Sequence, residues 1–341
     1  MRRPMLVVGG AGFVGHHLVS RLLADDHDVV VIDNLSRIGA ASNLRWLQSK
    51  RGFDFKAIDL VDAEAVLDAF REHRDAGRVL HLAGQVAVTT SVTNPRADFE
   101  ANALGTFNVL EAVRSSAPAA ALIYASTNKV YGGLEHLDVV EDAECYRYRA
   151  APFGVSEEMP LDFHSPYGCS KGSADQYVRD YHRIYGLRTV VFRQSCIYGY
   201  RQFGVEDQGW VAWFAISALR GRPMRVYGDG KQVRDVLFID DLLDAYDAAF
   251  SRIDGAAGRV YNIGGGVGNA ISLRQLLTYL EARTGGPLTL SYHDWRPGDQ
   301  RIFVSDIRKS EAELGWRPRV GWKNGVDQLS DWIAGNLGLF E

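Results

Sequence analysis

The chain has few cysteines and no excess of positive charge. Its 341 residues include three cysteines, Cys145, Cys169 and Cys196, which are too few for a disulfide framework and are not spaced like metal ligands. Lysine and arginine together number 38 against 42 aspartates and glutamates, a formal net charge of −4. A nucleic-acid partner is therefore not expected. These features predict a metal-free protein of a reducing compartment, which we take to be the cytoplasm.

Long hydrophobic runs are also missing. No apolar stretch approaches the roughly 20 residues that a membrane-spanning helix needs. The first apolar run, over residues 5–8, reaches a glycine too soon to form the core of a signal peptide. We therefore expect a soluble protein without a membrane partner.

The chain instead alternates short apolar runs with amphipathic stretches. Predicted strands cover 5–8, 29–32, 53–58, 79–82, 121–124 and 189–192, and predicted helices cover 13–23, 63–70, 101–114 and 170–185. Such alternation is typical of an α/β fold, here a Rossmann-type, doubly wound parallel sheet with helices on both faces.

The pattern loosens after Phe192, which indicates a second, smaller α/β domain on the substrate side. Late strand signals at 236–239 and 260–263 are expected to return to the large sheet, so the two domains would be interleaved. The predicted first domain covers 1–195 and about 236–264. The predicted substrate-binding domain covers about 196–235 and 265–341.

Glycines between the first strand and the first helix indicate a dinucleotide site. Gly9, Gly12 and Gly15 would allow a tight turn, a close approach to a pyrophosphate and packing of the helix on the strand. Asp33 ends the second strand about 20 residues further on, where a carboxylate can bind the adenosine ribose. A carboxylate there repels a 2′-phosphate and favours NAD. Arg37, with Arg2 and Arg3, keeps NADP open.

Four polar residues further along the chain predict the chemistry. Tyr167 and Lys171 are four residues apart, so on a helix they share a face, and the ammonium is expected to lower the pKa of the phenol. Ser126 and Thr127 follow the strand predicted at 121–124, where parallel sheets place ligands. We interpret Tyr167 as a base, and Ser126 and Thr127 as partners of a sugar hydroxyl that becomes a carbonyl.

These motifs, in this order over nearly the whole chain, resemble the extended short-chain dehydrogenase/reductase family. Within it, the segments 126–132, 161–172, 198–203, 207–211 and 230–235 resemble the CDP-paratose/CDP-tyvelose 2-epimerases. Departures from those relatives occur at 194–197 and 203–206, which are expected to face the sugar. The resemblance therefore supports the type of reaction more strongly than the identity of the substrate.

The resemblance also implies residue roles. It implies an NAD site formed by Gly9, Gly12, Phe13, Val14, Gly15, Asp33, Asn34, Ser36, Arg37, Asp59, Leu60, Leu82, Ala83, Gly84, Gln85 and Asn102, together with Tyr167 and Lys171. For a nucleotide-diphosphate sugar it implies contacts from Ser91, Asn128, Arg201, Arg234 and Arg301. Arg234 and Arg301 would bind the diphosphate, since guanidinium groups suit phosphate oxygens.

The implied reaction is inversion at carbon 2 through transient oxidation and re-reduction on the opposite face. A 4-epimerase of the same family remains an alternative, because it needs the same residues. A 4,6-dehydratase is disfavoured, because Asn128 and Lys129 stand where elimination calls for an acid and a carboxylate. A non-catalytic NAD-binding module is the remaining hypothesis. The resemblance further implies a homodimer or homotetramer paired through the helices at 101–114 and 170–185.

Overall fold

The computed structural model describes residues 3–50, 52–296 and 299–340, so Arg2 lies outside the described residues. The chain forms two compact units that alternate along the sequence. Unit 1 comprises residues 1–130, 165–193 and 243–261, and unit 2 comprises 131–164, 194–242 and 262–341. The segment 131–164 thus differs from the sequence prediction, which placed it in the first domain.

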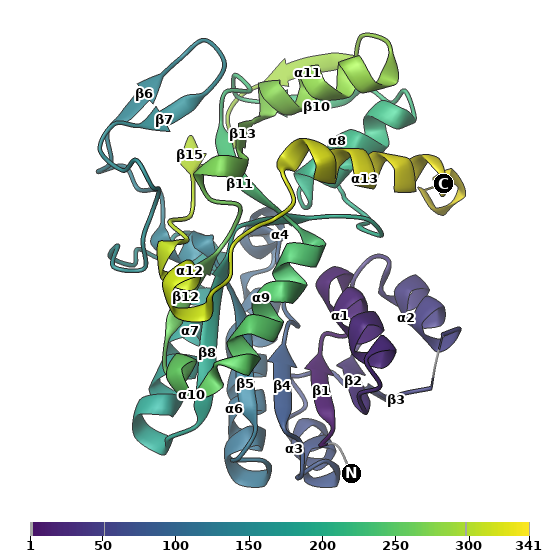
Figure 1. The fold of residues 1–341 in the computed structure, drawn as a ribbon, viewed down its shortest axis with the longest axis vertical. Helices are drawn as coiled ribbons and strands as arrows, with labels where there is room; N and C mark the ends of the chain where they lie inside the picture. Colours follow the sequence, from purple (N-terminus) through teal and green to yellow (C-terminus); the bar gives the residue numbers. More distant parts are fainter. Residues whose placement is uncertain (1–2, 51, 297–298, 341) are drawn as a thin grey trace. The chain divides into compact units, whose positions relative to one another are not determined.

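A seven-stranded sheet organises unit 1 (Figure 1). Its strand order is β12-β8-β5-β4-β1-β2-β3, and the pairs β1–β2, β1–β4, β2–β3 and β4–β5 are parallel. The strands are β1 (Met5–Val8), β2 (Val29–Asp33), β3 (Asp54–Ala57), β4 (Arg78–His81), β5 (Ala121–Thr127), β8 (Arg188–Gln194) and β12 (Val260–Ile263). The α/β class with a Rossmann-type sheet is therefore confirmed.

Helical elements lie between and around these strands in the chain, wholly or largely within unit 1. They are α1 (Phe13–Ala24), α2 (Ala40–Gln48), α3 (Ala63–Glu72), α4 (Val88–Thr93), α5 (Pro95–Phe99), the π-helical turn η1 (Glu100–Leu104), α6 (Gly105–Ser116), α7 (Ser165–Tyr185), α9 (Ile239–Ser251) and α10 (Ile253–Ala256). Arg21 of α1 donates to Asp244 and Asp247 of α9 at 2.7 and 3.1 Å, which joins these two helices.

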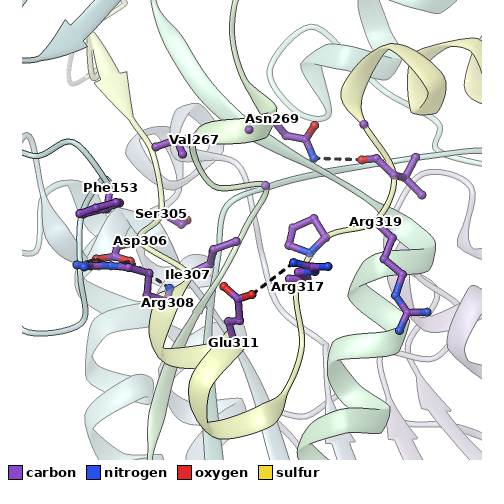
Figure 2. Close-up of a pocket in the computed structure, with 15 residues that line it drawn as sticks. Phe153, Val267, Asn269, Ser305, Asp306, Ile307, Arg308, Glu311, Arg317 and Arg319 are labelled. Carbon is purple, nitrogen blue, oxygen red and sulfur yellow. Dashed lines mark hydrogen bonds and ion pairs between the residues drawn. The ribbon is translucent and has the colours of Figure 1, made fainter.

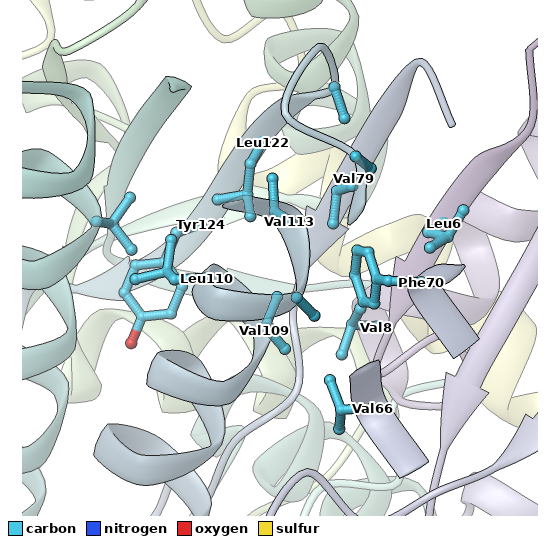
Figure 3. Packing of buried hydrophobic residues seen from close by; sticks show 14 of the residues in the cluster. Leu6, Val8, Val66, Phe70, Val79, Val109, Leu110, Val113, Leu122 and Tyr124 are labelled. Atoms are coloured by element: carbon cyan, nitrogen blue, oxygen red, sulfur yellow. The ribbon is translucent and has the colours of Figure 1, made fainter. Parts of the chain in front are cut away.

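The core of unit 1 lies between the sheet and helices α3, α6 and α7 (Figure 3). Leu6, Val8 and Leu122 of the strands pack with Phe70 of α3 and Val109 of α6, all fully buried. Alternate residues of a strand point to opposite faces, so the two apolar residues Leu6 and Val8 meet the same helices. Burying each such side chain stabilises the fold by about 1.5–3 kcal/mol.

Unit 2 contains smaller sheets. A four-stranded sheet is formed by β9 (Cys196–Tyr198), β11 (Val233–Phe238), β13 (Ala270–Ser272) and β15 (Ile302–Phe303), and two-stranded sheets pair β10 (Met224–Tyr227) with β14 (Leu290–His293) and β6 (Val139–Glu141) with β7 (Tyr146–Tyr148). The return of 260–263 to the large sheet is confirmed. The same expectation for 236–239 is wrong, because β11 pairs with β9, β13 and β15.

Unit 2 also contains α-helices and short helical turns. They are η2 (Asn128–Tyr131), which begins in unit 1, α8 (Trp210–Leu219), η3 (Val267–Asn269), α11 (Leu273–Thr284), α12 (Arg308–Leu314), α13 (Trp322–Ala334) and η4 (Leu337–Phe340). Across the described part of the chain, no helix combines the length and apolar character needed to cross a membrane.

Candidate active site

The glycine loop connects β1 to α1 in unit 1. Gly9 has φ +85°, and a methyl group there would lie 2.5 Å from the backbone nitrogen of Ala83. A methyl group on Gly15 would lie 2.1 Å from the carbonyl oxygen of Gly9. Gly12 is more open, with 3.3 Å to the same oxygen. Two glycines are thus required by backbone packing, and the third leaves the backbone accessible at the start of α1.

Asp33 at the end of β2 is tied to this loop. Its carboxylate accepts hydrogen bonds from the backbone nitrogens of Ala11 at 3.0 Å and Leu35 at 2.8 Å. Burial raises the pKa of Asp33, while backbone donors from Leu35, Ala11 and Gly12 act against that change. The loop and the carboxylate are therefore fixed relative to each other before any ligand binds.

The predicted adenine-binding segments form a second cluster beside Asp33. Asn34 donates to the Asp59 carboxylate at 2.9 Å and accepts from the Ser36 backbone nitrogen at 3.1 Å. Leu60 follows Asp59, and its carbonyl oxygen accepts from Asn108 at 2.7 Å. Burial lowers the pKa of Arg37, and the charge of Tyr167 acts in the opposite direction.

The segment after β4 continues the row of predicted cofactor residues. The backbone nitrogens of Leu82 and Ala83 donate to the Val8 carbonyl oxygen at 2.8 and 3.0 Å. A methyl group at Gly84 would lie 2.6 Å from Asn102 Oδ1, so only glycine fits. That Asn102 oxygen is buried and has no hydrogen-bond partner among the described residues. An orphaned acceptor at this place fits a cofactor that brings a donor.

Tyr167 and Lys171 both lie on α7, which begins five residues earlier than predicted. Ser165 starts the helix, where its hydroxyl accepts from the Gly168 backbone nitrogen at 3.2 Å, and proline follows it. Both site residues are buried. The ammonium of Lys171 donates to the Ala125 carbonyl oxygen at 2.5 Å and lies 4.3 Å from the centre of the Tyr124 ring.

The predicted lowering of the phenol pKa is not seen. Burial raises the pKa of Tyr167 to about 12, and the charge of Asp98 adds to this, against a hydrogen bond with Thr127 and the charge of Arg37. Burial likewise lowers the pKa of Lys171 to about 7, against the carboxylates of Asp175 and Asp98. Desolvation disfavours both charged forms, and it outweighs their partners in this structure.

Thr127 and Ser126 have different surroundings at the end of β5. Thr127 forms the hydrogen bond with Tyr167 that favours the phenolate. Ser126 donates its hydroxyl hydrogen to the Asp175 carboxylate at 2.8 Å. A hydroxyl has one hydrogen, and in this structure that of Ser126 is directed to Asp175. The role of the two hydroxyls toward a sugar stays a prediction.

A buried ion pair that was not predicted from the sequence lies behind Ser126. Arg193 of β8 binds Asp175 through two hydrogen bonds of 2.9 and 3.0 Å, and the side chains are 2% and 0% exposed. Asp175 lies four residues after Lys171 on α7, so the spacing that relates Tyr167 to Lys171 would also have pointed to it. Arg193 had no such signal.

The predicted substrate residues fall in both units. Ser91 and Asn128 belong to unit 1 and are buried, and the Ser91 hydroxyl donates to the Val88 carbonyl oxygen at 2.7 Å. Arg201, Arg234 and Arg301 belong to unit 2.

The three predicted phosphate-binding arginines differ in their surroundings. The guanidinium of Arg234 donates to Asp299 and to the Gln300 carbonyl oxygen, both at 2.7 Å, which fixes its orientation. Arg301 lies 5.5 Å from the centre of the Tyr146 ring. Burial lowers the pKa of Arg201.

A pocket of about 410 Å³ within unit 2 contains none of the predicted site residues (Figure 2). It is lined mainly by 265–269, 305–308 and 317–321. Arg308 donates to Asp306 at 2.6 Å and lies 4.0 Å from the Phe153 ring centre, and Arg317 is 3.7 Å from Glu311. These two cations are matched by carboxylates of the same pocket, and Arg319 also lines it.

Comparison with known proteins agrees with this geometry. Residues 5–264 match the NAD dependent epimerase/dehydratase family. The chain belongs to this family. It is 45% identical over 335 residues to the CDP-paratose 2-epimerase of Salmonella typhi, covering 97% of this chain and 99% of that protein. It is 34% identical to the UDP-glucose 4-epimerase of Mycolicibacterium smegmatis, covering 94% and 95%.

Solved structures of the epimerase/dehydratase family give the same picture. The Thermus thermophilus UDP-glucose 4-epimerase, solved in complex with NAD, has a TM-score of 0.83 and 34% identity, covering 98% of this chain and 99% of that one. The resemblance to nucleotide-sugar epimerases seen in the sequence motifs is therefore confirmed at the level of the family.

Proposed function

We propose that the protein is an NAD-dependent nucleotide-sugar 2-epimerase. The observation that carries the proposal is the 45% identity to a CDP-paratose 2-epimerase, which extends over 97% of the chain and so includes both units. The buried Tyr167, Lys171 and Thr127 of unit 1 supply the side chains that such a reaction needs. CDP-linked 6-deoxy or 3,6-dideoxy hexoses are the proposed substrates.

The chain's own residues fit NAD. Gly9 and Gly15 let the loop pack closely, Gly12 leaves the backbone at the start of α1 open to a pyrophosphate, and Asp33 stands at the end of β2, where a ribose hydroxyl would bind. The orphaned Asn102 oxygen supplies an unmet acceptor. When bound, NAD would accept a hydride from the sugar carbon and return it.

Tyr167 is the proposed acid and base. It would take the proton of the hydroxyl on carbon 2 as that carbon is oxidised, and would give it back after the sugar has presented its other face. Thr127 holds the phenol by a hydrogen bond. Lys171, as an ammonium, would favour the phenolate. Ser126 would orient this end of β5 through Asp175.

The nucleotide is proposed to be held by unit 2. Arg234 has its guanidinium oriented by Asp299 and Gln300, which prepares a planar donor group for phosphate oxygens. Arg301 and Arg201 are the further proposed phosphate contacts, and Ser91 and Asn128 are proposed to contact the sugar. Free thiols at all three cysteines support a reducing compartment, which we propose to be the cytoplasm.

A screen of nucleotide sugars tests the function. The purified protein is incubated with CDP-, UDP-, GDP- and dTDP-linked hexoses and their deoxy forms, and the products are examined by NMR. Inversion at carbon 2 of a CDP-sugar, lost in Tyr167→Phe, is the expected result. Inversion at carbon 4 would assign the 4-epimerase function instead. Elimination of water would assign the dehydratase function, against which Asn128 and Lys129 argue.

We further propose that two copies pair through α6 and α7. Phe107 of α6 and Tyr177 of α7 are 38% and 45% exposed, and their rings meet edge to face with centroids 5.8 Å apart. Exposed aromatic side chains of neighbouring helices are typical of interfaces. Analytical ultracentrifugation is expected to show a dimer or tetramer, and Phe107→Asp to dissociate it. A monomeric wild type would contradict this proposal.

A further inference from the structure

Asp98 is a buried carboxylate with neutral partners only among the described residues. It lies on α5 in unit 1 and is 1% exposed. One oxygen accepts from the Ser170 hydroxyl at 2.5 Å. The other accepts from Gln85 at 2.9 Å and from Asn102 at 3.2 Å. A carboxylate that is buried and bound only to neutral donors keeps its full charge available to any cation nearby.

Lys171 is the nearby cation. Ser170, which donates to Asp98, is its neighbour on α7, so the hydrogen bond holds this turn of the helix against α5. A methyl group at Gly84 would lie 2.6 Å from Asn102 Oδ1 and 3.9 Å from Lys171 Nζ, which places the Asp98 network beside the ammonium. Burial raises the pKa of Asp98, against the hydrogen bonds from Ser170 and Gln85 and the charge of Lys171.

Asp175, the other carboxylate near Lys171, is placed differently. It is paired with Arg193 through two hydrogen bonds of 2.9 and 3.0 Å, both side chains being buried. A carboxylate and a guanidinium in contact act on a third charge largely as a dipole, because their opposite charges cancel with distance. Taken one at a time, Asp175 raises the pKa of Lys171 more strongly than Asp98 does. Because only Asp175 has a guanidinium partner, Asp98 carries the charge that is not cancelled.

We propose that Asp98 is a positioning residue of the proposed epimerase reaction, the buried counter-charge that keeps Lys171 an ammonium beside Tyr167. The inference rests on the proposed function for its catalytic meaning. The claim that Asp98 keeps Lys171 protonated depends only on the contacts described above. In a desolvated site an amine without a counter-charge loses its proton, and a neutral amine gives no support to a phenolate. The charge of Asp98 itself raises the pKa of Tyr167, so any support that Asp98 gives to the phenolate passes through Lys171.

The charged and titratable groups around Lys171 and Tyr167 leave this role to Asp98. They come from five elements and from the loop after β2, namely His81 of β4, Tyr124 of β5, Asp98 of α5, Tyr167 and Asp175 of α7, Arg193 of β8 and Arg37. Burial lowers the pKa of His81 to about 3, so this imidazole is neutral at pH 7. Burial raises the pKa of Tyr124, which is neutral as well.

The test measures the protonation of Lys171 directly. Protein labelled with ¹³C at the lysine ε carbons is titrated by NMR in the NAD-free form, and the Lys171 signal is assigned with Lys171→Arg. Two neutral variants, Asp98→Asn and Asp98→Ser, are expected to lower the Lys171 midpoint by about one pH unit or more. Circular dichroism checks that each variant is folded.

Three control variants separate the effect of charge from that of structure. Ser170→Ala removes a hydrogen bond from Asp98 but keeps the carboxylate, so the midpoint should stay within a few tenths of a unit of wild type. Asp68→Asn removes an exposed carboxylate of α3 and should leave the midpoint unchanged. Asp98→Glu retains the charge and should restore most of the wild-type value.

Two results would overturn the inference. One is a wild-type Lys171 midpoint in the folded neutral variants, and the other is an equal shift in Ser170→Ala. The titration needs no substrate, so it tests the Asp98 inference independently of the proposed function. If only the proposed function is wrong, the Lys171 midpoint will still shift in the Asp98 variants, but the protein will epimerise no nucleotide sugar. In the active enzyme, the alkaline limb of the kcat profile should move to lower pH in Asp98→Asn by the same amount as the midpoint.

Discussion

Removing one member of the Asp175–Arg193 pair should be far more costly than removing both. Arg193→Met leaves the Asp175 carboxylate, 0% exposed, with Ser126 and Gln176 as its remaining donors. Breaking a buried ion pair in this way costs about 3–5 kcal/mol, because the surviving charge stays desolvated without its partner. Asp175→Leu combined with Arg193→Met removes both charges, so the double variant should recover at least about 2 kcal/mol of that loss.

The measurement is urea unfolding followed by far-UV circular dichroism, with the four proteins of the cycle compared at pH 7. Arg71→Gln is the control, because its partner Asp68 lies 2.9 Å away on the same helix and the Arg71 side chain is 61% exposed. An exposed pair is worth at most about 1 kcal/mol. If Arg193→Met also falls within 1 kcal/mol of wild type, the reasoning about this pair is refuted.

Three further predictions concern the loop, the hydroxyls and pH. Gly9 has φ +85°, and a methyl group there would lie 2.5 Å from a backbone atom, so Gly9→Ala should weaken NAD binding by more than tenfold in calorimetry. Gly286 has open space around it, so Gly286→Ala should leave NAD binding unchanged. Equal affinities of the two variants would contradict the role of the loop. Thr127→Val should lower kcat by about 100-fold, because Thr127 forms a hydrogen bond with the Tyr167 phenol. Ser126→Ala should lower kcat by less than tenfold, because the Ser126 hydroxyl bonds to Asp175. The reverse order in steady-state assays would instead support a direct contact of Ser126 with the sugar. Burial raises the pKa of Asp235 to about 6 from 3.8, so its contribution to stability is complete below about pH 4 and is lost as pH rises through 6. In Asp235→Asn, the free energy of unfolding should therefore change by about 3 kcal/mol less than in wild type between pH 4 and pH 6. An unchanged pH dependence would show that this carboxyl does not titrate in that range.

The sequence predicted the features that depend on local spacing. The glycines, Asp33 and the Tyr167–Lys171 interval all follow from the geometry of one strand, one turn or one helix, and the structure places them accordingly. The fold class followed in the same way from alternating apolar runs. The start of α7 was missed, although Ser165 and Pro166 form an ordinary beginning of a helix.

Features that depend on distant contacts could not be read from spacing. The role of Ser126 is decided by Asp175, 49 residues away, and the environment of Lys171 by Asp98 on another helix. The segment 131–164 joins unit 2 without a clear hydrophobic period, and β11 pairs with strands of unit 2 rather than with the large sheet. In each case a tertiary partner, not the local sequence, determines the outcome.

The central claim is that carbon 2 of a nucleotide-linked sugar is inverted by removing and returning the same hydrogen. The most direct measurement uses a CDP-sugar carrying deuterium at carbon 2, converted in ordinary water and examined by NMR and mass spectrometry. The account predicts a product inverted at carbon 2 that retains the deuterium there. A product inverted at carbon 2 with hydrogen from solvent in its place would contradict it.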